Sequence, residues 1–333
     1  MKRRYPIQSH LLGFVILVAL LAALPLFVTE RYYLGQIIIF MIWAGVASQW
    51  NVLTGHAGVF SLAQMLFFAI GAYGVAMLAS YLEISPWLGI VASACLAGLA
   101  ALVIGMACLR LATAYVALLT FAIANMVVAL IVTDSNCYVH ALGACQPFFG
   151  GSNGFSQFPD LGFRKLLHAQ WIIGDYFVVL AAFAISFLAS IAVIHGRIGL
   201  AFRALSDSSI YAAARGINRT RFRLVAFVIT AFFTGMMGGV HAAHFRYAGP
   251  SLFDFSTLLF VLSMIIIGGL KSTWGPVFGA AMMMVLVEFA KSVGDIRNTV
   301  IGVVLVLFVA LLPKGIAGAT GRLFGRLREV RGA

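Results

Sequence analysis

The amino-acid sequence predicts an all-α membrane protein, with about ten transmembrane helices in a single transmembrane domain over residues 1–333. Three observations lead to this prediction. Of the residues, 62% are hydrophobic and 10% are charged, whereas a soluble domain carries about 25% charged residues. The apolar residues form stretches long enough to cross a bilayer, and the basic residues gather in every second connection. A chain so poor in charge is unable to cover a water-exposed surface, so most of its surface is expected to face lipid.

The candidate spans follow from hydropathy, since a helix that crosses the hydrocarbon core needs about 20 apolar residues. They are 11–29, 35–53, 64–81, 87–109, 114–133, 172–194, 222–243, 255–270, 274–291 and 298–312. The first is interpreted as a retained helix because no small-residue cleavage site follows it. Only residues 271–273 separate the eighth and ninth, which form either two crossings or one hairpin that does not fully cross. Residues 54–63 are either a plain loop or a re-entrant segment.

The distribution of charge predicts the orientation. Ten crossings place both termini on one side. If that side is cytoplasmic, the inner segments hold 16 of the 22 basic residues but, of the acidic ones, only Asp207 and Glu329. This asymmetry follows the positive-inside rule, and it accounts for the net charge of +12 without a nucleic-acid partner. The 16 basic residues are Lys2, Arg3, Arg4, Arg110, Arg197, Arg203, Arg215, Arg219, Arg221, Arg223, Lys271, Lys314, Arg322, Arg326, Arg328 and Arg331.

Three segments outside the spans are long. Residues 134–171 are predicted to be an external loop, residues 195–221 a cytoplasmic loop and residues 313–333 a basic cytoplasmic tail. In the cytoplasmic loop, Asp207 or the serine before it is a good helix N-cap, and Gly216 is a natural left-handed helix stop. These two signals predict a short helix over about 207–215. Because so short a helix is marginal alone in water, it is expected to dock either on a cytoplasmic protein or on lipid.

The cytoplasmic loop also resembles a known family. The stretch from Gly199 to Phe227 is similar to the loop of the permease subunits of branched-chain amino acid ABC importers. The matching residues are Gly199, Ala201, Arg203, Ala204, Asp207, Ala212, Ala213, Gly216, Ile217, Asn218 and Phe227.

Further blocks resemble the same family in the same order along nearly the whole chain. They are Asn51–Leu62 with Phe68–Tyr73, Leu109–Arg110 with Tyr115, Ala117 and Thr120, Gly150–Gly154, Ile267–Leu270 with Gly275–Pro276 and Gly279–Ala280, and Leu312–Ile316. Their number and order point to the second, longer permease of the pair.

The resemblance implies a subunit of the bacterial inner membrane with several partners. A periplasmic binding protein would deliver branched-chain amino acids or similar small polar solutes. A second permease subunit would complete the pathway. Two cytoplasmic ATPase subunits would dock on the 207–215 helix, with Arg203, Asp207, Ala212, Ala213 and Gly216 as the coupling residues. The sequence has no G-x-x-x-x-G-K-[ST] phosphate loop, so ATP hydrolysis is expected in a separate subunit, and no cofactor or catalytic residue is expected here.

A different class of protein remains as the alternative, a proton-coupled secondary transporter. Such a carrier usually needs a carboxylate or histidine relay within the membrane, and no acidic residue falls near the middle of a predicted span. His241 and His244 have a spacing that suits a metal, but no third ligand is evident. They are expected to anchor their helix at the membrane interface.

Polar residues within the spans provide the candidates for the translocation pathway. Gln64 and Asn125 are proposed to line it, because each lies in a block that resembles the family and polar groups are costly in lipid. Hydrogen bonding between neighbouring helices is the simpler interpretation of such amides.

Two further sets of residues are singled out. Gly268, Gly269, Gly275 and Pro276 are predicted to break helices in a protein-lined place and to act as hinges, with plain packing as the alternative. Cys137 and Cys145 lie in the external loop, where an oxidising compartment would allow them to form a disulfide.

Overall fold

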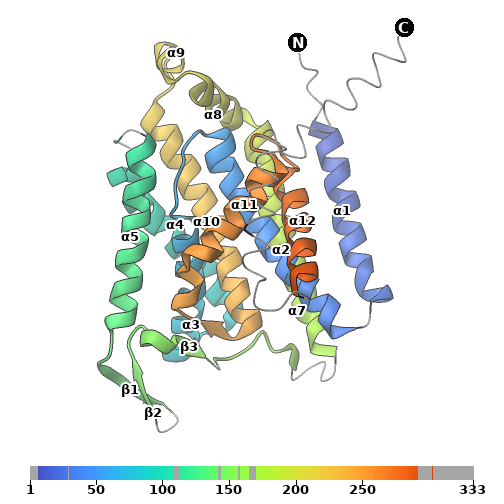
Figure 1. The fold of residues 1–333 in the computed structure, drawn as a ribbon, viewed down its shortest axis with the longest axis vertical. Coiled ribbons are helices and arrows are strands. Elements are labelled where there is room, and N and C mark those ends of the chain that lie inside the picture. The colour runs from blue at the N-terminus through green and yellow to red at the C-terminus, as the bar shows by residue number, and fades with distance from the viewer. Residues whose placement is uncertain are drawn as a thin grey trace.

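The structure, a computed structural model, describes residues 7–28, 30–108, 111, 113–141, 144–156, 158–164, 170–291 and 302. It is a bundle of helices with short strands in connections at one end (Figure 1). The helices are α1 (Ile7–Phe27), α2 (Arg31–Asn51), α3 (Gln64–Tyr81), α4 (Pro86–Cys108), α5 (Thr113–Thr133), α7 (Trp171–His195), α8 (Arg197–Asp207), α9 (Ser209–Ala214), α10 (Arg219–Phe245), α11 (Phe255–Gly268) and α12 (Gly275–Ala290). The shorter elements are η1 (Val52–His56), η2 (Gly151–Asn153), η4 (Pro250–Phe253), β1 (Cys137–Ala141), β2 (Ala144–Pro147), β3 (Phe155–Ser156) and β4 (Tyr247–Ala248).

Seven of the described helices are long and apolar enough to cross a membrane: α1, α2 continued by η1, α3, α4, α5, α7 and α10. Helices α11 and α12 have 14 and 16 residues. At 1.5 Å per residue they are about 21 and 24 Å long, less than the hydrocarbon core of about 30 Å. They pack against each other, as both alternatives predict. The span 298–312 and the tail 313–333 lie, except for residue 302, outside the described residues, so the count of ten and the side of the termini stay predictions.

The connections gather at two opposite ends of the bundle (Figure 1). The α8 end, as we call it, holds α8, α9 and the turn 269–274, whereas the β end holds the four strands. Described charged residues at the α8 end are Arg197, Arg203, Arg215, Arg219, Arg221, Arg223, Lys271 and Asp207. Those at the β end are Arg31, Arg164, Arg246, Lys291, Glu30, Glu83, Asp134, Asp160, Asp175, Asp254 and Glu288. The two ends therefore differ in charge as the predicted orientation requires.

The external connection 134–171 departs from the all-α prediction. Strands β1 and β2 form an antiparallel pair, and β3 pairs with β4, which follows α10. The turn between the pairs needs glycine, since Gly150 and Gly154 have φ of 77° and 69°. The strands were missed because they have only two to five residues and lack the alternation that marks a half-buried strand.

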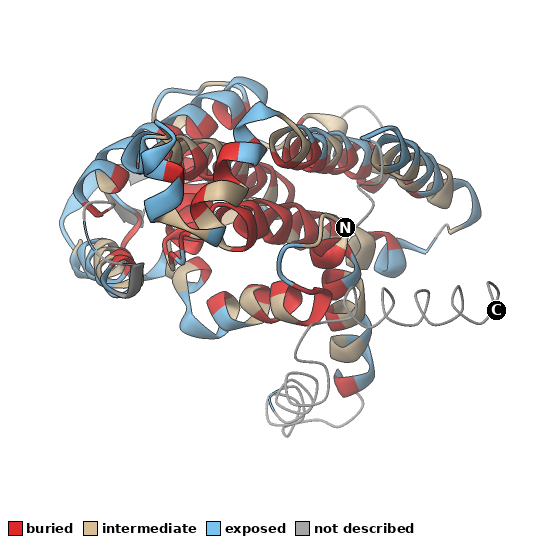
Figure 2. Cartoon of the chain, turned by 90° about the horizontal axis from the view of Figure 1, so that it is seen from above, coloured by how far each residue is buried: buried red, intermediate tan, exposed pale blue. Residues whose placement is uncertain are grey.

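The core lies where α10 packs against α3 and α4. A Cβ atom at Gly71 would overlap the carbonyl oxygen of Gly235, and one at Gly238 would overlap that of Phe68. Small residues therefore let the two backbones approach closely, as in other membrane helix pairs. Figure 2, which views the bundle from above, shows buried residues concentrated in the middle helices and exposed ones on the outer helices.

The segment between α2 and α3 is irregular but buried. Its side chains at Ala57, Val59 and Ser61 are at most 2% exposed. Its backbone groups find partners inside the protein: the indole of Trp50 donates to the Ser61 carbonyl at 3.0 Å, and the Leu62 N–H donates to the hydroxyl of Thr120 at 3.2 Å. Non-helical backbone at membrane depth requires such protein partners.

Candidate functional site

Helix α8 turns away from α7 at an elbow that Arg203 holds together. Its guanidinium donates to the carbonyl of Ile194 at 2.8 Å and to that of Gly199 at 3.3 Å. The carbonyl of Ile194 belongs to the last turn of α7, where helix carbonyls lack partners within the helix. Phe202 and Leu205 on the inner face of α8 are buried. The structure thus gives Arg203, a predicted coupling residue, a bracing role at the base of the coupling segment.

The predicted helix over 207–215 is wrong at its start. Asp207 is the last residue of α8 rather than an N-cap, and α9 begins at Ser209 after an extended Ser208 with φ −157° and ψ 109°. The apolar face of α8 is buried against the bundle, so this helix continues through Asp207. The N-cap of α9 is therefore Ser208, one residue after Asp207. The carboxylate of Asp207 lies instead 3.8 Å from the ammonium of Lys271, across from α8.

The predicted end of the same helix is confirmed. Gly216 has φ of 81°, its N–H donates to the Ala213 carbonyl at 2.9 Å, and the N–H of Ile217 donates to the Ala212 carbonyl at 3.1 Å. These two bonds form a Schellman motif, which needs a left-handed residue and therefore favours glycine. The side chain of Asn218 then caps α10 by accepting from the N–H of Arg221 at 3.0 Å.

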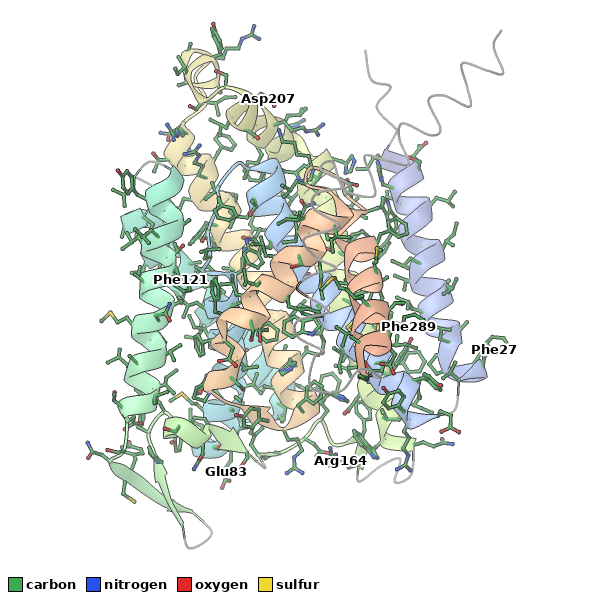
Figure 3. The ribbon with its side chains drawn as sticks, viewed as in Figure 1. Phe27, Glu83, Phe121, Arg164, Asp207 and Phe289 are labelled. Atoms are coloured by element: carbon green, nitrogen blue, oxygen red, sulfur yellow. The ribbon has the colours of Figure 1, made fainter. Side chains whose placement is uncertain are left out.

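Helix α9 presents two large apolar side chains to solvent at the α8 end. Ile210 is 80% exposed and Tyr211 77% exposed. The predicted coupling residue Ala212 faces inward at 4% exposure, whereas Ala213 is exposed. Figure 3 shows α9 beyond the labelled Asp207, at the edge of the molecule. Ile210 and Tyr211 were not among the predicted coupling residues, although two bulky apolar residues in an arginine-rich loop were a visible signal.

The two candidate pathway residues lie apart. Gln64 is fully buried, where its amide donates to the hydroxyl of Thr230 at 3.3 Å and its carbonyl accepts from Thr234 at 3.0 Å. It thereby joins α3 to α10. Asn125 is exposed on α5 and donates to the Phe121 carbonyl of its own helix at 2.9 Å. That both line a pathway stays a prediction.

An apolar cavity of about 700 Å³ separates α5 from α3 and α4 toward the β end. Ile70, Leu96 and Leu130 are among its walls, and Asp134 and Phe148 lie near its outer side. Neither Gln64 nor Asn125 lines it.

The four hinge candidates shape the turn between α11 and α12. Cβ atoms at Gly268 and Gly275 would overlap backbone of the facing residue, Gly269 has φ of 104°, and Pro276 occupies the first turn of α12. Close packing therefore accounts for both Gly268 and Gly275, and proline is favoured at a helix start. A hinge function stays a prediction.

A buried hydrogen bond between Asp175 and His244 at the β end was missed. The carboxylate of Asp175 on α7 lies 2.9 Å from Nδ1 of His244 on α10, and both side chains are 7% exposed. His244 is therefore held inside the protein, and the expectation that it anchors α10 at the interface is wrong. The pairing was hidden because 69 residues separate the partners. Among the described residues, no cluster of three or more His, Cys, Asp or Glu side chains is arranged to hold a metal ion.

The predicted disulfide falls on the hairpin of β1 and β2. Cys137 is disulfide-bonded, and the backbones of the two strands run side by side. The side chain of Cys145 lies outside the described residues, so the partner stays a prediction.

Comparison with known proteins identifies the family. A family model for the permease component of branched-chain amino acid transport systems matches residues 32–310. Two relatives are named high-affinity branched-chain amino acid transport system permease protein LivM. The Salmonella typhimurium protein is 26% identical in an alignment of 292 residues that covers 81% of this chain and 66% of that protein. The Escherichia coli protein is 26% identical in an alignment of 328 residues that covers 92% of this chain and 74% of that protein. No solved structure matches the chain.

These comparisons confirm the resemblance drawn from the sequence blocks, and the longer permease of the pair fits LivM. The relatives are transport subunits, in agreement with the prediction that the chain is not an enzyme. The family and the seven apolar helices together support a multi-pass protein of the bacterial inner membrane. Since the family model spans most of its length, the chain belongs to the family of permease components of branched-chain amino acid transport systems.

Proposed function

We propose that the chain is a permease subunit of an ATP-driven importer for branched-chain amino acids or similar small polar solutes. In this proposal a periplasmic binding protein delivers the solute, a second permease completes the pathway, and two cytoplasmic ATPase subunits supply the energy. The observation that carries the proposal is α9, a short helix held out from the bundle with Ile210 and Tyr211 exposed. Large apolar side chains that protrude together from a charged surface mark a contact with a protein or a membrane, and we propose the protein contact here.

The geometry of the α8 end supports a role in transmitting force. Arg203 braces α8 against α7, and the Schellman motif at Gly216 joins α9 firmly to α10, which crosses the centre of the bundle. A displacement of α9 would therefore be transmitted directly to α10, because no flexible linker separates the two helices. Aromatic residues such as Tyr211 often contribute most of the binding energy at protein interfaces.

The alternative, a proton-coupled carrier, is favoured by one feature, the buried pair of Asp175 and His244. The pair lies in the first turns of α7 and the last turn of α10, at the β end of both helices. A relay across the membrane would need further titratable groups near mid-span. We therefore prefer the ATP-driven importer.

The docking of ATPase subunits on α9 is testable with the double variant Ile210→Ser/Tyr211→Ser. The chain would be co-expressed with the ATPase subunits encoded beside it, and their co-purification would be quantified. We expect association to fall at least about tenfold, which corresponds to about 1.4 kcal/mol, with an unchanged melting temperature. Arg221→Ala, an exposed change off α9, is the control. Undiminished association of the double variant would contradict the proposal.

A further inference from the structure

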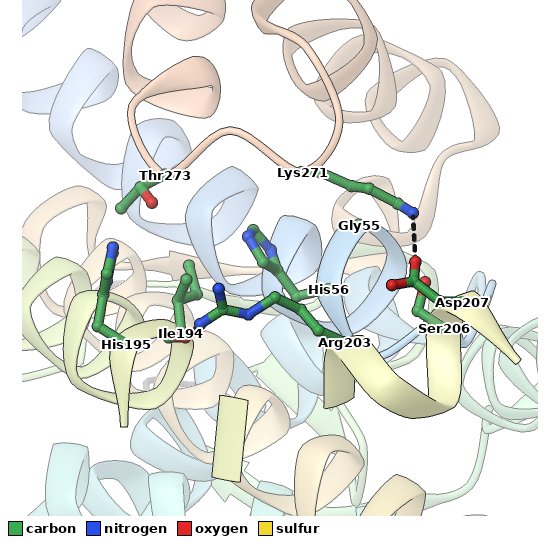
Figure 4. A pocket seen from close by; sticks show the side chains of 9 residues that line it. All are labelled: Gly55, His56, Ile194, His195, Arg203, Ser206, Asp207, Lys271 and Thr273. Atoms are coloured by element: carbon green, nitrogen blue, oxygen red, sulfur yellow. Dashed lines mark hydrogen bonds and ion pairs between the residues drawn. The ribbon is translucent and has the colours of Figure 1, made fainter. Parts of the chain in front are cut away.

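A small polar cavity of about 240 Å³ lies at the α8 end, between the α7–α8 elbow, η1 and the turn 269–274 (Figure 4). Its position in the bundle is set by close contacts. A Cβ atom at Gly55 would stand 2.8 Å from the backbone nitrogen of Lys271, and the amide of Asn51 donates to the Ser272 carbonyl at 2.8 Å. The turn is therefore pressed against η1, and the cavity is the space left beside that contact.

Two histidines provide hydrogen-bond acceptors in this cavity. Nδ1 of His56 lies 3.3 Å from the Asn51 carbonyl, and Nδ1 of His195 lies 3.0 Å from the Ile191 carbonyl. Because a carbonyl only accepts, each Nδ1 is the nitrogen that carries a proton, and in the neutral form of either ring Nε2 is then an acceptor. Within the described part of the chain neither Nε2 has a hydrogen-bond partner. His56 is only 5% exposed, so its Nε2 has little access to bulk water.

Two cations face the same space. Arg203 uses Nε and one terminal nitrogen for backbone carbonyls, which leaves its other terminal nitrogen available for a ligand. Lys271 lies on the opposite side, at the rim, where its ammonium is 3.8 Å from the carboxylate of Asp207. Figure 4 shows the guanidinium of Arg203 below His56, with the pair of Lys271 and Asp207 beside it. Imidazole rings, two cations and the carboxylate of Asp207 thus line one cavity.

We infer that this cavity binds a zwitterionic amino acid. The carboxylate would pair with Arg203 and Lys271, and the ammonium would donate to Nε2 of His56 and of His195. A simple anion would leave the imidazole acceptors unpaired, and an amine would leave Arg203 unpaired, both at a cost in binding. A volume of about 240 Å³ is large enough to hold a small amino acid.

This inference rests on the proposed function and adds a site to it. The cavity lies between two elements. Arg203 belongs to α8, which leads directly into α9, and Lys271 belongs to the turn before α12. A solute bound there would bridge these two elements. The transported solute would therefore have a binding site at the α8 end, in contact with the coupling segment.

The test measures binding to the purified full-length chain in lipid nanodiscs, without ATPase subunits. The probes are L-valine, 3-methylbutanoate, which lacks the ammonium, 2-methylpropylamine, which lacks the carboxylate, and inorganic phosphate. We expect saturable binding of L-valine, with the three other probes at least about tenfold weaker. His56→Leu and Lys271→Met should each weaken L-valine binding at least about tenfold. Arg203 is left unchanged because it braces the elbow.

The control is Arg197→Ala, an exposed residue of α8 that does not line the cavity, and it should bind L-valine like the unchanged chain. The melting temperature of each variant verifies that it is folded. Absent L-valine binding, equal binding by the His56 and Lys271 variants, or tighter binding of phosphate would each overturn the inference. ATPase association through α9 is measured separately, so either result can fail while the other holds.

Discussion

Helices α3 and α10 are buried against each other, whereas helix α5 is largely exposed on the surface of the chain. In the most apolar part of each helix, 72% of the residues of α3 are buried but only 28% of those of α5. Glycines bring α3 and α10 into backbone contact. By contrast, α5 leaves Tyr115, Leu118 and Met126 more than 60% exposed.

The difference shows which parts of the permease are complete within one chain. The α3–α10 contact depends on shape, because in lipid close packing rather than water exclusion holds helices together. The exposed face of α5 makes no such fit within the described chain and is available to lipid or to a second subunit. Changes in α3 or α10 should therefore affect folding, whereas changes on α5 should affect function with little effect on folding.

The largest effect is expected from Gly238→Leu. Its Cβ would overlap the carbonyl oxygen of Phe68, and a backbone atom is unable to move aside as a flexible side chain does. We expect the free energy of unfolding to fall by about 3 kcal/mol, measured by detergent-induced unfolding. Gly35→Leu on α2 is the control, because nothing lies within 4 Å of its Cβ position. Equal stability of the two variants would refute the role of shape.

A smaller effect is expected from Gln64→Leu. The change removes the hydrogen bonds to Thr230 and Thr234. Since such bonds between membrane helices contribute about 0.6 kcal/mol each, unfolding should become easier by about 1 kcal/mol. Thr234→Val, which removes one of the two bonds, should cost about half as much. A stable variant with lost solute transport would instead favour the pathway role predicted for Gln64.

The smallest effect on stability is expected from Asn125→Leu on α5. Because the amide bonds only its own helix among the described residues, the free energy of unfolding should change by less than about 0.5 kcal/mol. Transport by the assembled importer should fall if Asn125 lines the pathway. Met126→Leu, an exposed neighbour, serves as the control. Loss of stability would mean that α5 is packed as tightly as α3.

Much of the fold was predictable because the hydropathy and charge of a segment depend only on the residues within that segment. The spans of α1 to α5, α7 and α10 agree with the predicted ranges to within a few residues. Gly216 was also identified correctly, since a helix stop depends on a residue's own backbone freedom. The start of α9 was not, because burial of Phe202 and Leu205 against the bundle, rather than the capping strength of Asp207, decides where α8 ends.

By itself the sequence determined that the chain lies in a membrane, where its long apolar helices run, which end is basic, and the family to which it belongs. Only the tertiary structure decided which polar residues meet. Asp175 reaches His244, Gln64 joins α3 to α10, and Lys271 approaches Asp207 across the cavity at the α8 end. The physical reason is that crossing a bilayer depends on the composition of a continuous segment. A binding site depends instead on side chains from distant segments that only helix packing brings together.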